Sequence, residues 1–118
     1  MSQQIGFDAE KQARDYLIAQ GLEWLHSNYR CRLGEIDLIM RDREHLVFVE
    51  VRARASSLFG GAAASVGYSK RQKLLKTASY YLLAYPREHE QAIRFDVLGM
   101  DGVPPRINWI KNAFGSDY

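Results

Sequence analysis

Residues 34–52, GEIDLIMRDREHLVFVEVR, contain two apolar segments separated by a short charged one. In the first segment, Ile36, Leu38 and Met40 alternate with other residues, which places them on one face of a strand. The second segment, residues 45–52, is rich in the β-branched and aromatic residues that favour strands. Because the RDRE tetrapeptide between the segments is polar and short, the stretch predicts a β-hairpin.

The spacing of apolar residues on either side of the hairpin predicts two helices and three more strands. Apolar residues recur at three- and four-residue intervals over residues 3–20 and 69–85, as on one face of a helix. Shorter apolar runs predict further strands at residues 22–29, 93–98 and 106–110. Helices and strands in this order indicate an α/β fold with a mixed five-stranded sheet flanked by helices. The glycine-rich residues 54–68 predict a mobile loop.

The composition is that of an ordinary globular chain. A length of 118 residues fits one domain, residues 1–118, and 47% hydrophobic with 25% charged residues is typical of soluble proteins. No apolar run reaches the roughly 18 residues of a membrane span, and the first residues lack the pattern of a signal peptide. The only cysteine, Cys31, excludes an internal disulfide, so the cytoplasm is the expected compartment and no membrane partner is expected.

Acidic residues in the hairpin form the main candidate site. With the turn centred on Arg43–Glu44, Asp37 lies opposite Glu50, and Glu35 lies opposite Arg52. Carboxylates that face each other across strands repel, and a divalent cation such as Mg²⁺ would remove that cost. Pairing of Glu50 with a nearby arginine is the alternative, and a register slip of one residue would separate the two carboxylates.

Two charged residues lie at the borders of the predicted apolar helix faces. Glu10 lies about 20° beyond the Leu17 edge of its helix, so it can reach the sheet or remain an exposed carboxylate. Lys70 lies about 20° outside the apolar stripe of the second helix, on the Tyr81 edge. It can approach the same site or simply solubilise the surface.

Basic residues gather locally although the net charge is only +2. Six arginines fall within residues 30–54, and lysines and an arginine open the second predicted helix. Cations there oppose the helix dipole, and a bound phosphate would reverse that effect. Solvated surface charge is the alternative. On the first interpretation, the residues expected to contact nucleic acid are Arg30, Arg54, Lys70, Arg71 and Lys73.

Other polar and aromatic residues give weaker signals. The three histidines show no metal-ligand spacing, and Cys31 has no evident histidine partner. Trp24 and Trp109 are expected in the core rather than as surfaces on which bases stack.

Two motifs, GEIDLI at residues 34–39 and FVEVR at residues 48–52, resemble the YraN-like family of bacterial proteins. With Ala9–Glu10, Lys70 and the RFDV motif at residues 94–97, the resemblance spans nearly the whole chain. That family is similar in motif layout to the PD-(D/E)xK nuclease superfamily and to archaeal Holliday junction resolvases. The resemblance implies a restriction-endonuclease-like fold.

The same resemblance implies roles for individual residues. It makes Asp37 and Glu50 metal ligands and Glu10 an accessory acidic residue. The signature lysine of the superfamily falls at Arg52, which is a departure, because arginine stays protonated and cannot act as a base. Arginine can still stabilise charge on a phosphate, and Lys70 is a candidate for the missing amine.

The resulting prediction is an endonuclease dependent on Mg²⁺ or Mn²⁺ that acts on DNA, including branched or damaged structures. The expected catalytic residues are Glu10, Asp37, Glu50, Arg52 and Lys70. A nucleic-acid-binding module without turnover is one alternative, favoured by Arg52. A protein-interaction domain without a nucleic-acid ligand is the other, favoured by the low net charge. The resemblance to junction resolvases also suggests a homodimer.

Overall fold

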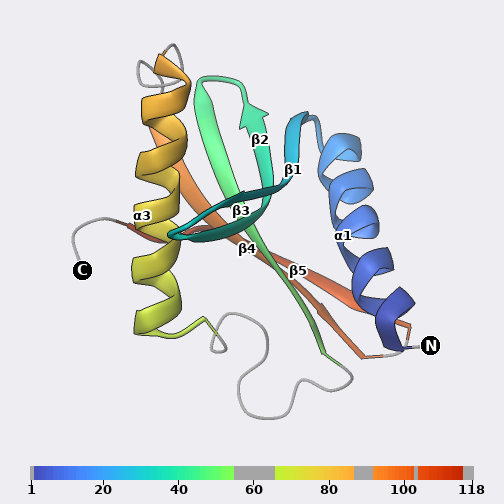
Figure 1. Cartoon of the computed structure of the whole chain (residues 1–118). Coiled ribbons are helices and arrows are strands. Elements are labelled where there is room, and N and C mark those ends of the chain that lie inside the picture. The colour runs from blue at the N-terminus through green and yellow to red at the C-terminus, as the bar shows by residue number, and fades with distance from the viewer. Residues whose placement is uncertain (1, 55–65, 87–91, 103, 116–118) are drawn as a thin grey trace.

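The computed structural model describes residues 2–54, 66–86, 92–102 and 104–115, and only the backbone for residues 2–8. Most of the predicted loop, residues 55–65, therefore lies outside the described residues. The elements are α1 (Ser2–Ala19), β1 (Glu23–Cys31), β2 (Gly34–Asp42), β3 (His45–Arg54), α3 (Tyr68–Ala84), β4 (Ala92–Asp101) and β5 (Arg106–Phe114) (Figure 1).

The five strands form one mixed sheet in the order β1-β2-β3-β4-β5. The pairs β1–β2, β2–β3 and β4–β5 are antiparallel, whereas β3 and β4 are parallel. A parallel pair needs a crossover connection, and α3 lies in the connection between β3 and β4. The predicted α/β fold with a mixed five-stranded sheet flanked by helices is confirmed, and it is consistent with a restriction-endonuclease-like fold.

The two helices cover opposite faces of the sheet (Figure 1). One core lies under α1, where Ala13 and Leu17 pack with Val47 and Val49 of β3. The other lies under α3, where Tyr81 and its neighbours pack with Leu46 and Phe48 of the same strand. Because both faces are covered, β3 is apolar at consecutive positions instead of alternating. Neither helix is long and apolar enough, within the described residues, to cross a membrane.

The alternation along β2 breaks near Asp37. Leu38 and Met40 pack in the core under α1, as one face of a strand requires, but Ile36 packs in the core under α3. The prediction that these three residues share a face is therefore wrong. In β1, Asn28 has a positive φ of 53° and lies between residues that pair with Ile36 and Leu38. The regular pleat is thus interrupted on both strands at the level of Asp37.

A candidate metal centre and its surroundings

The pairing of β2 with β3 positions the first two carboxylates. Backbone pairing runs from Leu38–Val49 to Asp42–His45, which is the predicted register. At the next position, Oδ2 of Asp37 accepts a hydrogen bond of 2.9 Å from the backbone N–H of Val51. The Asp37 side chain therefore reaches across to β3, beside Glu50.

Asp37, which is half-buried, interacts with the buried Glu50 as a like charge. Glu50 is only 4% exposed. Burial, followed by the charge of Glu50, raises the pKa of Asp37 from 3.8 to about 7, although the hydrogen bond from Val51 opposes this shift. A carboxyl group whose ionisation is disfavoured by a neighbouring carboxylate is an arrangement that a bound cation would stabilise.

The two oxygens of Glu50 have different surroundings. Oε2 lies 3.2 Å from Nε of Arg52 and 3.6 Å from Nζ of Lys70. Oε1 is buried and has no hydrogen-bond partner among the described residues. Pairing of Glu50 with an arginine, the alternative raised from the sequence, therefore does occur. It occupies one oxygen and leaves the other for a further ligand.

Two more carboxylates approach Asp37. One carboxylate oxygen each from Glu10, Glu35 and Asp37 lie within 4.8 Å of one another. Burial and then the charge of Asp37 raise the pKa of Glu10, while a hydrogen bond with the Asn28 side chain lowers it. Glu10 thus reaches the sheet from the border of the apolar face of α1, as its place on the helix suggested.

Glu35 is the member of this group that was not predicted as a site residue. The sequence placed it opposite Arg52, but its Oε2 lies 3.2 Å from Nε of Arg30 on the neighbouring strand β1. The available signal was its spacing of two residues from Asp37, which puts both side chains on one face of a strand. The set of Glu10, Glu35, Asp37 and Glu50 offers the hard oxygen ligands that Mg²⁺ and Mn²⁺ prefer.

Four of the six clustered arginines divide between the two ends of the hairpin. Arg30 and Arg52 lie at the acidic site, paired with Glu35 and Glu50. Arg41 and Arg43 lie toward the turn, where Arg41 pairs with Glu23 at 2.9 Å and Arg43 has a positive φ of 56°. The cluster in the sequence is therefore not one basic surface in the fold.

Helix α3 brings its basic residues to the acidic end. Its N-cap is Gly67, a residue without a side chain that could cap the first backbone N–H groups. In the first turn, Lys70 pairs with Glu50. Lys73 is exposed, and its Cβ and backbone oxygen approach Gly34, next to Glu35. Arg71 is half-buried, and Arg54 ends β3 two residues beyond Arg52. Their contact with a nucleic acid remains a prediction.

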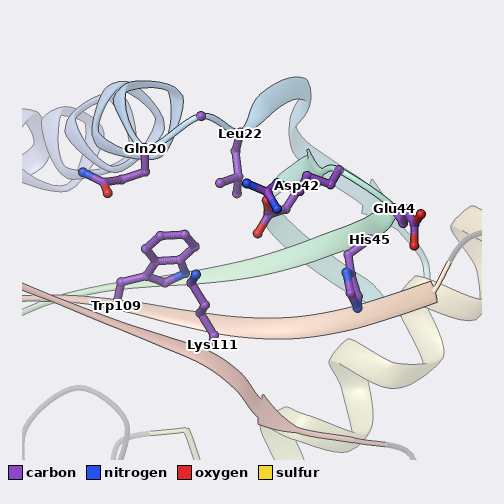
Figure 2. A pocket seen from close by; sticks show the side chains of 9 residues that line it. Gln20, Leu22, Asp42, Glu44, His45, Trp109 and Lys111 are labelled. Atoms are coloured by element: carbon purple, nitrogen blue, oxygen red, sulfur yellow. The ribbon is translucent and has the colours of Figure 1, made fainter.

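A wider cavity lies at the turn end of the hairpin, away from these carboxylates. It has a volume of about 710 Å³ and is lined by residues from the end of α1, the β2–β3 turn and β5, including Trp109 and Lys111 (Figure 2). Of the two carboxylates that line it, Asp42 and Glu44, the first is engaged by Arg94 at 3.0 Å. The acidic group around Asp37 does not line it, so we locate the candidate site at the acidic end.

The tryptophans differ in their surroundings. Trp109 is half-buried, and its Nε1 donates a hydrogen bond of 2.8 Å to Asp96. Trp24 is 44% exposed, so the expectation that it lies in the core is wrong. It lies on β1, an edge strand, beside a shift in register between Trp24 and His26. An edge strand has a neighbouring strand on one side only, which leaves part of such a side chain open to solvent.

Comparisons with known proteins identify relatives along nearly the whole chain. The model of the uncharacterised protein family UPF0102 matches residues 9–100. The chain belongs to this family. Its resemblance to the YraN-like family is thereby confirmed. A UPF0102 protein of Legionella pneumophila subsp. pneumophila (strain Philadelphia 1) is 50% identical over 97% of both chains.

Two further UPF0102 proteins show the same extent of similarity. That of Alcanivorax borkumensis is 46% identical over 95% of this chain and 92% of its own, and that of Pseudomonas fluorescens is 45% identical over 96% and 94%. These names describe a family and not an activity, so the function has to be argued from the site.

Proposed function

We propose that the protein is a metal-dependent phosphodiesterase that cleaves nucleic acid, with DNA as the expected substrate. The observation that carries the proposal is the pair formed by the half-buried Asp37 and the buried Glu50, with two cations, Arg52 and Lys70, beside Glu50. Carboxylates beside cationic groups suit a metal ion and a phosphate bound together. The resemblance to the PD-(D/E)xK superfamily supports the same reading.

The roles follow from the contacts of each side chain. Asp37, Glu50 and the adjacent Glu10 would hold Mg²⁺ or Mn²⁺, with Glu35 within reach of the same position. When bound, the metal supplies an activated water and neutralises charge at the phosphate. Arg52 and Lys70 can donate to the phosphate oxygens, because both are partly exposed, at 32% and 39% of their side chains.

Arg52 also favours a second candidate function, a binding module without turnover. Its Nε faces Glu50 from the position of the superfamily's lysine, but a guanidinium does not lose a proton near neutral pH. Lys70 reaches the same carboxylate oxygen from α3 and is the amine available to replace that lysine. The phosphodiesterase and the binding module differ only in whether the Lys70 amine can take the part of the missing lysine in cleavage.

Replacing Arg52 by lysine should raise metal-dependent cleavage about tenfold or more above a feeble wild-type level, because it restores an amine beside Glu50. The measurement is cleavage of branched, nicked, single-stranded and duplex DNA with Mg²⁺, with Mn²⁺ or with EDTA. Arg41→Lys is a matched control, because Arg41 is also 32% exposed and paired with a glutamate, but lies toward the turn. It should leave cleavage unchanged.

Two outcomes would change this view. Robust wild-type cleavage that falls in Arg52→Lys would make arginine the adapted catalytic group. Cleavage by neither form, on every substrate and with either metal, would favour the binding module.

The double variant Lys70→Ala/Arg71→Ala should bind DNA more weakly and with a flatter dependence on salt. Each lost phosphate contact lowers the slope of log K against log salt by about one on duplex DNA. The measurement is fluorescence anisotropy from 50 to about 200 mM salt. Arg43→Ala/Lys111→Ala removes the same charge at the turn-end cavity and should keep both affinity and slope. Equal slopes in the two double variants would refute the assignment.

A further inference from the structure

A small groove opens beside the acidic site, between α1 and β1. It has a volume of about 220 Å³ and is lined by Glu10, Lys11, Arg14, Ser27 and Asn28. Glu10 belongs at once to this groove and to the acidic group around Asp37. The groove is therefore continuous with the candidate metal centre.

An exposed aromatic ring lies beside the groove, in contact with two of the residues that line it. The guanidinium of Arg14, which lines the groove, lies over the ring of Trp24 at 5.1 Å from its centroid. Nε1 of Trp24 donates a hydrogen bond of 2.9 Å to Oγ of Ser27, another lining residue. These two contacts orient the indole, and yet 44% of Trp24 remains exposed. Since Arg14 lies over one face of the ring, a base can stack on the part of the indole that Arg14 leaves exposed, or on the ring and the guanidinium together.

The charges along the groove suit a nucleotide. Lys11 is exposed, and Arg14 is half-exposed and only loosely paired with Asp15, at 3.6 Å. Both can contact phosphate, while the hydroxyl of Ser27 and the amide of Asn28 can donate to and accept from a base or sugar. The groove is smaller than pockets of about 300–1,000 Å³ that enclose drug-sized ligands, so it suits one nucleobase and not a base pair.

We propose that this groove binds an unpaired nucleotide next to the phosphate held at the acidic site, with its base stacked on Trp24. The substrate is then a nucleic acid with a single-stranded segment at the cleavage position, rather than a continuous duplex. This inference rests on the proposed function and specifies its substrate class. The contact is sequence-tolerant, because every base has a π-face.

The test compares binding to a blunt duplex, to a duplex with a short single-stranded arm and to an oligothymidylate, in EDTA so that no cleavage occurs. Trp24→Ala should weaken binding of the oligothymidylate and the armed duplex about tenfold or more, and leave the blunt duplex within about twofold. Trp24→Phe, which keeps a ring, should retain most of the affinity. Tyr80→Ala is the matched control, because Tyr80 is also 44% exposed but lies on α3, across the sheet.

Two further measurements detect the nucleotide directly, and a third checks that each variant is folded. Lys11→Gln should lower the salt slope for the oligothymidylate by about 0.7, the value for one phosphate contact to a single strand. Oligothymidylate should quench the indole emission of the wild type but not that of Trp24→Phe, in which only Trp109 remains. Urea unfolding of each variant checks that it is folded.

The outcomes separate this inference from the proposed function. If Trp24→Ala and Tyr80→Ala lose equal affinity, or if oligothymidylate causes no quenching, the nucleotide groove is refuted even where metal-dependent cleavage occurs. If no substrate is cleaved but single-strand binding depends on Trp24, the groove stands and the phosphodiesterase falls. Failure to bind any nucleic acid at low salt would overturn both.

Discussion

Asp37→Asn should stabilise the metal-free protein at pH 8 and abolish the stabilisation that Mn²⁺ or Mg²⁺ provides. The pKa of Asp37 is raised from 3.8 to about 7, chiefly by burial and then by the charge of Glu50. The folded protein therefore binds this proton more tightly than the unfolded chain, so the free energy of unfolding falls as pH rises from about 4 to about 7. A neutral amide removes this loss, which is at most about 4 kcal/mol for a shift of about three pKa units.

The amide should fit the same position. Its oxygen can accept the hydrogen bond that the N–H of Val51 now donates to Oδ2 of Asp37, so the change removes charge with little change in shape. On the proposed function, a metal ion would lose its central ligand without that carboxylate. Cleavage by the variant should therefore fall about a hundredfold or more in any form of the protein that cleaves.

The measurement is urea unfolding at pH 5 and pH 8, in EDTA and in excess Mn²⁺. The variant should gain most stability over the wild type at pH 8 and only about 1.6 kcal/mol at pH 5, because most of the loss occurs between pH 5 and pH 7. Mn²⁺ at 100 times its dissociation constant should add about 2.7 kcal/mol to the wild type alone. Asp15→Asn, at a side chain that is 58% exposed, is the control and should behave like the wild type. Equal stabilisation of both proteins by Mn²⁺ would remove Asp37 from the metal centre.

The opposition of Asp37 and Glu50 could be predicted because it depends on local information. A short polar turn fixes the register of a hairpin, and the register fixes which side chains meet. The approach of Glu10 was accessible for a similar reason, because its place at the border of an apolar helix face limits where it can point.

The ion pair of Glu35 with Arg30 and the packing of Ile36 could not be predicted in this way. Both depend on β1, where Asn28 interrupts the pairing with β2 at the level of Asp37. A rule of strict alternation cannot anticipate such an interruption. The exposure of Trp24 likewise depends on the order of strands, because β1 lies at the edge of the sheet and has a neighbouring strand on one side only.

The RFDV motif at residues 94–97 contains an aspartate, Asp96, that connects β4 with β5, at the edge of the sheet opposite β1. Asp96 is fully buried and accepts hydrogen bonds from Nε and Nη2 of Arg94, at 2.9 and 3.0 Å. It also accepts from Nε1 of Trp109 at 2.8 Å and from the backbone N–H of Asn112 at 2.9 Å. Since Arg94 also pairs with Asp42 at 3.0 Å, the network joins β4 with β2 and β5.

This network explains a feature of the backbone. The register of β4 against β5 shifts between Phe95 and Val97, and Asn112 opposite has a positive φ of 52°. Residues other than glycine adopt a positive φ only at a cost in free energy. The hydrogen bond from the backbone N–H of Asn112 to Asp96 helps to offset that cost.

Asp96→Ala should therefore destabilise the protein by about 3–5 kcal/mol, because it leaves the Arg94 guanidinium, the Trp109 indole N–H and the Asn112 N–H without their acceptor in a buried place. Asp96→Asn should cost less, since one oxygen remains to accept. In a Trp24→Phe background, Trp109 is the sole tryptophan, so its emission reports the network during urea unfolding. Glu23→Ala, which removes the exposed partner of Arg41, is the control and should cost no more than about 1 kcal/mol. If Asp96→Ala instead lowers the free energy of unfolding by less than about 1 kcal/mol and leaves the Trp109 emission unchanged, β4 and β5 hold their register without this carboxylate.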